Sequence, residues 1–250
     1  IIFPANIQKM ISKEFQQYYD NLCYSRNRSE VFTDFIDYCL YILSVGMLRE
    51  EYTKLEKKYS DDELAAFREM LDIVSIHSEG CKDALGDFFM EYVSHGHNGQ
   101  FFTPMIIGDF MAKAVATDEI QPGQSVCDPS CGSGQLLLSA AKKCVEKETE
   151  RPYCYGSDID LNCVKMCVIN MIINSIPGEI AWMNTLTMEH WRSYHIKLIL
   201  IAGMWFPSLT VTGPGETSFI QRMEKTLEEK PEMRETIREK IEAKQLTLEF

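Results

Sequence analysis

The chain has 250 residues, of which 45% are apolar, enough for one α/β domain with a helical appendage. Its formal net charge of −12 argues against broad, unaided binding to a phosphate backbone, for which clustered Lys and Arg supply most of the affinity. No apolar run approaches the ~18 residues that a transmembrane helix needs, and the first residues lack the basic segment of a signal peptide.

The nine cysteines include no Cys-x-x-Cys pair, and no set of Cys and His residues has the spacing of a zinc site. We therefore expect reduced thiols, a cytoplasmic protein and no bound metal.

Residues 1–98 predict a helical N-terminal domain. Apolar side chains such as Phe32, Phe35 and Ile36 recur at helical spacing, which is typical of a face packed in a core. Ser60 stands three positions before Glu63, a capping-box pattern that predicts the start of another helix.

Short apolar strands alternate with helices between residues 99 and 206. We expect strands over residues 125–127, 153–157, 180–182 and 197–202, with helices between them. Alternation of this kind predicts an α/β, Rossmann-like fold with a parallel sheet and right-handed crossovers. Residues 207–250 follow as a turn-rich segment and a charged helical tail, which Pro231 divides into two helices.

The first of these strands ends at Asp128 and turns through Gly132 and Gly134 into a helix. Glycines allow a ligand to approach the backbone, a helix N-terminus favours a negative group, and the acid can hold an ammonium group. The spacing Asp-x-x-x-Gly-x-Gly differs from Gly-x-Gly-x-x-Gly, so it favours a nucleoside that carries an amino acid over a nicotinamide dinucleotide. A plain strand–helix turn is the alternative.

Two further polar residues follow the next strands. Asp158 ends the second strand, where an acid can accept hydrogen bonds from ribose hydroxyls or can cap the following helix. Asn184 follows the third strand, where it can bond to an adenine edge or form a turn. Both positions lie at the carboxyl ends of strands, where open α/β sheets bind ligands.

At this point the sequence resembles a known family, the modification subunits of type I restriction systems within the N6-adenine DNA methyltransferases. The resemblance runs from residue 83 to residue 206 and rests on five motifs: Asp83-Ala-Leu-Gly-Asp87, Gly99-Gln-Phe-Phe-Thr103-Pro104, Val126-Cys-Asp-Pro-Ser-Cys-Gly-Ser-Gly134, Tyr155-Gly-Ser-Asp-Ile-Asp160 and Asn184-Thr-Leu186.

The resemblance implies a methyltransferase sheet over residues 99–206 with S-adenosylmethionine as cofactor. It implies that Asp158 holds the ribose and that Asn184 approaches the adenine. The residues implied to cover the cofactor or to hold its methionine part are Phe101, Thr103, Pro104, Asp128, Pro129, Ser130, Gly132, Ser133 and Gly134.

The chain departs from this family at the catalytic motif, Asn-Pro-Pro followed by Phe or Tyr. Here Gly203-Met204-Trp205-Phe206 follows the fourth strand. Phe206 matches the aromatic residue that stacks on a flipped base, but Gly203 has no side chain to accept a hydrogen from the adenine amine. Loss of such a partner costs about 3 kcal/mol of transition-state stabilisation, or ~10²-fold in rate.

A second departure is length, because the family's sheet has seven strands and only about four parallel strands are predicted here. We therefore expect an S-adenosylmethionine-binding protein of the DNA adenine-N6 methyltransferase kind. The alternative is a catalytically inactive, truncated methyltransferase fold that serves as a binding or regulatory subunit. Methylation of a protein or RNA amide is a third, weaker reading.

The expected partners are DNA and a specificity or modification subunit. The last six residues also resemble short peptides that dock on bacterial sliding clamps, through Gln245, Leu246, Leu248 and Phe250. A frayed terminus is the alternative reading of that segment.

Overall fold

A computed structural model describes residues 5–45, 48–94, 102–115, 124–146, 151–236 and 238–239. The front of the chain is helical, as predicted. Its elements are α1 (Ala5–Leu22), η1 (Cys23–Ser25), α2 (Arg28–Leu43), α3 (Arg49–Lys58), α4 (Asp61–His77), α5 (Ala84–Phe89) and η2 (Met90–Ser94).

Local chemistry sets where these helices begin. Asn27 caps α2 by accepting a hydrogen bond from the Glu30 amide. Ser60 and Glu63 form the predicted capping box at the start of α4. The predicted apolar faces are buried, since Phe32, Phe35 and Ile36 are at most 1% exposed.

The rest of the described chain alternates between strands and helices. Its elements are α6 (Met105–Val115), β1 (Ser125–Asp128), α7 (Gln135–Glu146), β2 (Tyr153–Asp158), α8 (Leu161–Ile173), β3 (Gly178–Asn184), β4 (Glu189–Ile201), β5 (Met204–Thr212) and α9 (Phe219–Glu229). The strands form one sheet in the order β1-β2-β3-β4-β5. The α/β class is therefore confirmed. Residues 231–236 are again helical after a break at Lys230, so Pro231 begins a second helical segment in the tail, as the sequence predicts.

The direction of the fourth strand differs from the prediction. Strands β1, β2 and β3 are parallel, but β4 runs antiparallel to β3, and β5 antiparallel to β4. Only residues 185–188 connect β3 to β4, whereas a parallel connection needs a crossover of a dozen or more residues. Among the described residues the sheet therefore has five strands, of which three are parallel, in place of the predicted set of about four parallel strands.

The segment predicted as turn-rich after residue 206 belongs largely to β5. A two-residue turn, Ala202-Gly203, joins β4 to β5, with Ile201 paired to Met204 across it. Both turn residues have positive φ, +50° and +83°, which is the backbone of the type I′ turns that suit the twist of a hairpin.

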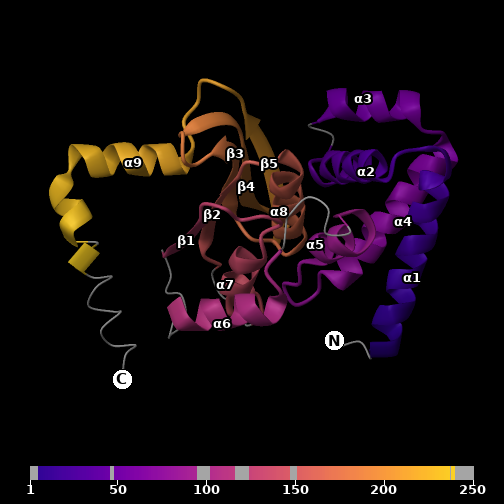
Figure 1. Ribbon diagram of the computed structural model, residues 1–250, viewed down its shortest axis with the longest axis horizontal. Helices are drawn as coiled ribbons and strands as arrows, with labels where there is room; N and C mark the ends of the chain where they lie inside the picture. Colours follow the sequence, from indigo (N-terminus) through magenta and orange to yellow (C-terminus); the bar gives the residue numbers. More distant parts are fainter. Residues whose placement is uncertain are drawn as a thin grey trace.

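Helix α8 lies between the sheet and the helical front (Figure 1). Its Lys165 forms an ion pair with Asp37 of α2, and the Asn162 amide donates to the Thr33 hydroxyl at 3.1 Å. Buried side chains from α1 to β5 belong to one hydrophobic cluster, so the core runs across the predicted domain border at residue 98. The border itself stays a prediction.

Helix α9 lies on the other side of the sheet and projects away from the body of the molecule (Figure 1). Its first residue, Phe219, stacks on Tyr155 of β2 with ring centroids 3.4 Å apart. The nine cysteines all lie within the described residues, and none of them forms a disulfide. Within the described ranges, no helix has the length and apolar character that a bilayer crossing requires.

Candidate functional site

The loop between β1 and α7 has the strand–turn–helix form that the sequence predicts. Gly132 and Gly134 have φ values of +52° and +100°, which side-chain-bearing residues rarely adopt. A Cβ on Gly134 would lie 2.7 Å from Sγ of Cys167 in α8, and one on Gly132 would lie 3.2 Å from the Phe102 ring. Both glycines are therefore required by backbone conformation and close packing.

Asp128, the last residue of β1, is the group in this loop whose hydrogen bonding is incomplete. Its side chain is 8% exposed, and its Oδ1 accepts a hydrogen bond from the Ser130 amide at 3.1 Å. Its Oδ2 is buried and has no hydrogen-bond partner among the residues that the structure describes. Burial raises the pKa of this carboxyl. A buried oxygen of this kind gains stability from a donor, and most of all from a cation.

Asp158, at the end of β2, binds the glycine loop. Its Oδ2 accepts a hydrogen bond from the Gly132 amide, and its Oδ1 accepts one from the Asp160 amide, both at 2.9 Å. The cap of α8 is Asp160, which accepts from the amides of Asn162 and Cys163. The structure thus brings Asp128, Asp158 and the glycines together at the carboxyl ends of adjacent parallel strands.

Asn184 ends β3, and its side chain forms a turn. Its Oδ1 accepts hydrogen bonds from the amides of Leu186 and Thr187, at 3.0 and 3.2 Å. The side-chain oxygen of Asn184 therefore takes part in a turn, which is the alternative role that the sequence allowed for this residue. Contact with an adenine stays a prediction for Asn184.

The segment before α6 lies only partly within the described residues. Phe101 is outside them, Thr103 is half-buried and Pro104 is exposed. The Pro104 carbonyl accepts from the amides of Ile107 and Gly108, so this proline directly precedes α6 and accepts its first hydrogen bonds. Phe102, which the sequence reasoning did not select, has its ring against Gly132 and 5.7 Å from that of Phe89.

Phe206 and Gly203 are not brought to this site. Through the pairing of adjacent strands, Asp158 lies level with Trp182 of β3 and with Arg192 of β4. Phe206 instead lies level with Ile199, which is seven residues farther along β4. At ~3.4 Å per residue, this separation is about 24 Å along the strand. The predicted catalytic position therefore lies at the opposite end of the sheet, in a hairpin whose Trp205 and Phe206 are 60% and 41% exposed. Base stacking by Phe206 stays a prediction without support from this placement.

Ser133, expected to hold the methionine part, points into the core instead. It is 1% exposed, and its hydroxyl donates to the buried carboxylate of Asp83. Asn170 of α8 donates to the same carboxylate at 2.7 Å. The sequence reasoning did not select Asp83 or Asn170 as site residues, although a polar Asn within an apolar helix face is itself a signal.

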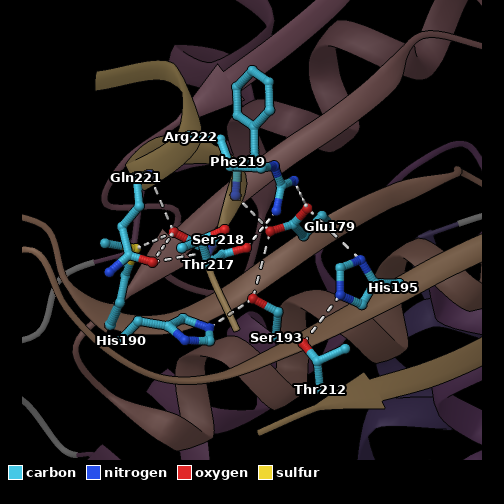
Figure 2. Close-up of polar contacts among 11 residues, drawn as sticks. Glu179, His190, Ser193, His195, Thr212, Thr217, Ser218, Phe219, Gln221 and Arg222 are labelled. Carbon is cyan, nitrogen blue, oxygen red and sulfur yellow. Dashed lines mark hydrogen bonds and ion pairs between the residues drawn. The ribbon is translucent and has the colours of Figure 1, made fainter. Parts of the chain in front are cut away.

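A second polar cluster lies on the opposite face of the sheet from α8. Figure 2 shows Glu179, Ser193 and His195 of the strands together with Phe219 and Arg222 of α9. Oε1 of Glu179 accepts from the Phe219 amide at 2.7 Å, and its Oε2 lies 2.6 Å from Nη2 of Arg222.

This cluster contains a serine near a histidine and an acid, but it is not a nucleophile site. The Ser193 hydroxyl lies 2.8 Å from Nε2 of His190 and 3.5 Å from Oε1 of Glu179. Ser193 is 0% exposed, so a substrate cannot reach its oxygen. The cluster instead fastens α9 to the sheet. Within the described part of the chain, no group of His, Cys, Asp and Glu side chains has the arrangement of a metal site.

Comparison with known proteins gives one family match. Residues 81–206, half of the chain, match the family model described as N-6 DNA methylase. The type I restriction enzyme MpnII methylase subunit of Mycoplasma pneumoniae is 31% identical over 124 residues, which cover 46% of this chain and 23% of that protein. The EcoEI methylase subunit of Escherichia coli is 26% identical over 130 residues, covering 46% and 26%.

Among solved structures, the methyltransferase subunit of a type I restriction-modification system from Streptococcus thermophilus matches with a TM-score of 0.41. The identity is 15%, over 68% of this chain and 56% of that one. The matched part of the chain spans about a quarter of the length of the MpnII and EcoEI methylase subunits.

Proposed function

The chain belongs to the N-6 DNA methylase family, as its motifs predict, and we propose on this basis that it binds S-adenosylmethionine through the loop of residues 128–134 for DNA adenine-N6 methylation. S-adenosylmethionine is the expected cofactor of the family. The observation that carries the proposal is the Oδ2 atom of Asp128, which is buried and has no hydrogen-bond partner among the described residues.

The residues present fit the methionine part of this cofactor. An α-ammonium group would supply the missing donor to Asp128 and would neutralise its buried charge. The positive φ of Gly132 and Gly134 shapes the turn that leads into α7, and the N-terminus of α7 favours a carboxylate. Asp158 holds the Gly132 amide, and a carboxylate can accept further hydrogen bonds, here from the ribose hydroxyls.

When bound, the cofactor supplies an electrophilic methyl group. The chain's own part is to bind and orient: Asp128 holds the ammonium group, the α7 N-terminus holds the carboxylate, and Asp158 fixes the loop. Thr103 and Pro104 cover the site from the segment that precedes α6, in the proposed arrangement.

We further propose that DNA is bound with the help of partner subunits. The relatives described above are methylase subunits of type I restriction enzymes. A net charge of −12 disfavours a broad phosphate contact by this chain alone, so a basic partner subunit would supply that contact.

Titration calorimetry of the chain with S-adenosylmethionine tests the cofactor proposal. We expect saturable binding that Asp128→Asn weakens at least tenfold, since the neutral amide loses the charge that holds the ammonium group. Glu229→Gln, an exposed substitution in α9, is the control and should bind as the parent does. An absence of binding at millimolar ligand would contradict the proposal.

A second function is favoured by the placement of Gly203. The position where the family carries its catalytic Asn lies in the turn between β4 and β5. This turn follows Ile201, nine residues from the level of Asp158 at Arg192, or about 31 Å along the strand. We propose that the chain by itself binds the cofactor without transferring its methyl group, and serves as a binding or regulatory subunit. Robust incorporation of labelled methyl groups into DNA by the isolated chain would overturn this second proposal.

A further inference from the structure

A buried carboxylate joins the helical front to the glycine loop. Asp83 directly precedes α5, is 4% exposed, and caps that helix by accepting a hydrogen bond from the Gly86 amide at 2.8 Å. The same carboxylate accepts from the hydroxyl of Ser133 and, at 2.7 Å, from the side-chain amide of Asn170. Burial raises the pKa of Asp83, and its hydrogen bonds to Ser133, Gly86 and Asn170 oppose the rise.

These contacts fix residue 133 at two points. The Ser133 hydroxyl is held by Asp83, and the Ser133 carbonyl accepts a hydrogen bond from the Asn170 amide at 3.0 Å. Ser133 lies between Gly132 and Gly134, the two loop residues with positive φ. A residue held at both its side chain and its carbonyl cannot rotate, so the conformations of both glycines depend on it.

The helical front is packed against the loop too closely for a larger residue. A Cβ on Gly86 would lie 2.2 Å from Oδ2 of Asp83 and 2.6 Å from Oγ of Ser133. Gly86 is therefore the residue that allows α5 to approach the loop, and the Asp83–Ser133 bond depends on this approach.

We propose that Asp83 is a positioning residue that holds the loop of residues 131–134 in the conformation that binds the cofactor. Asp158 holds the Gly132 amide from β2, and Asp83 holds Ser133 from the helical front, so the loop is fixed from two separate elements. The inference rests on the proposed function for its link to the cofactor, whereas its link to the loop conformation stands on the contacts alone.

Two variants and one control separate positioning from general stability. Asp83→Asn keeps the shape of the side chain and an acceptor for Gly86. It replaces the charged acceptor of the Ser133 hydroxyl with an amide group that can only donate to the Ser133 oxygen, so the charge-assisted bond is lost. Asp83→Ala removes every contact. Ser60→Ala removes the helix cap of α4, which does not touch the loop. It is the matched control, because Asp83 also caps a helix and its replacement removes that cap as well.

The first measurement is hydrogen exchange at the loop amides of the chain without cofactor. We expect Asp83→Asn to speed exchange at Gly132, Ser133 and Gly134 by tenfold or more, and Ser60→Ala to leave it unchanged at temperatures well below either midpoint. Ser133→Ala should have the same local effect as Asp83→Asn, and the double variant should add little to either. Unchanged loop exchange in Asp83→Asn would overturn the inference.

The second measurement is affinity for S-adenosylmethionine. Asp83→Asn should weaken it about tenfold, whereas Ser60→Ala should lower the melting temperature and keep the affinity within twofold. If Asp83→Ala does not fold, Asp83→Asn and Ser133→Ala decide the outcome. If the parent chain does not bind the cofactor, the proposed function fails, and loop exchange still tests the role of Asp83.

Discussion

Glu179 and Arg222 form an ion pair of 2.6 Å in which the two partners differ sharply in exposure. The glutamate side chain is 3% exposed, and the arginine side chain is 47% exposed. The pair joins the start of β3 to the first turn of α9, and the same carboxylate accepts from the Phe219 amide. A buried carboxylate with these partners is costly to leave unpaired.

We predict that Arg222→Ala destabilises the chain by about 2–3 kcal/mol, since it leaves the Glu179 charge buried with fewer partners. The melting temperature should fall by roughly 4–12 °C for a chain of this length. Glu229→Gln breaks an exposed pair with Lys225 on the same helix and should cost at most about 0.5 kcal/mol. Equal losses in the two variants, measured by thermal unfolding, would show that Glu179 is not the anchor of α9.

Cofactor affinity should depend on pH through Asp128. Burial raises the pKa of this carboxyl in the free chain, and a bound ammonium group would lower it again because it stabilises the charged form. Binding should therefore release protons near and below the raised pKa. Affinity should be constant well above that pKa and should fall as the pH drops through it.

Calorimetry in buffers of different ionisation enthalpy measures this proton release directly. Asp128→Asn removes the titrating group, so its weaker affinity should lose this part of the pH dependence. If the affinity of the variant falls with decreasing pH as steeply as that of the parent, the pH dependence comes from a group other than Asp128.

Gly134→Ala should destabilise the chain and weaken cofactor binding. Its backbone has φ +100°, and the new Cβ would meet the Cys167 sulfur at 2.7 Å. Gly215→Ala is a matched control, because Gly215 has the same φ and its Cβ would meet no atom within 4 Å among the described residues. Backbone strain alone should cost Gly215→Ala about 1–2 kcal/mol, and the added overlap should cost Gly134→Ala about 1–3 kcal/mol more.

Denaturant unfolding measures how much more stability Gly134→Ala loses than Gly215→Ala. This additional loss should become smaller when Cys167→Ala is added, because the overlapping sulfur is then absent. If both substitutions lowered the free energy of unfolding equally, the loop would accommodate the added methyl group at Gly134 without a further loss of stability.

Gly203→Asn should leave methyl transfer to DNA unchanged. The residue lies in the β4–β5 turn at φ +83°, a conformation that Asn tolerates, so the hairpin should persist. The restored side chain would still lie about 31 Å along the strand from the level of Asp158. Labelled-methyl incorporation measures the outcome, and a gain in activity would mean that residues 203–206 reach the cofactor in another arrangement of this hairpin.

The first three strands and the loop that follows β1 could be predicted because local signals agree there. Asp128 and Asp158 each end a short apolar strand, and glycines mark the turn into α7. The capping box of Ser60 and Glu63 gives the start of α4 from a segment of four residues. Each of these features depends on neighbours in the sequence, which is why sequence patterns report them.

The fourth strand could not be predicted in the same way. Residues 198–201 form a continuous apolar run, which is typical of a buried parallel strand. Ile199, Leu200 and Ile201 are nevertheless 42–58% exposed, because β4 extends past the start of β3 into a hairpin. The direction of β4 depends on the short turn at Asn184, and the role of Asp83 depends on a contact between residues 50 positions apart. Neither is visible in the spacing of apolar residues.

The continuous hydrophobic core determines how the molecule unfolds. Phe35 of α2, Leu137 of α7 and Ile196 of β4 belong to one buried cluster, so the helical front and the sheet share a single cooperative unfolding unit. A fragment that begins near residue 98 would lose Asp83 and leave the front-facing side of α8 bare, and the glycine loop would melt with it. The conformation of the loop of residues 128–134 therefore depends on the helical front, through the shared core and the contact of Asp83 with Ser133.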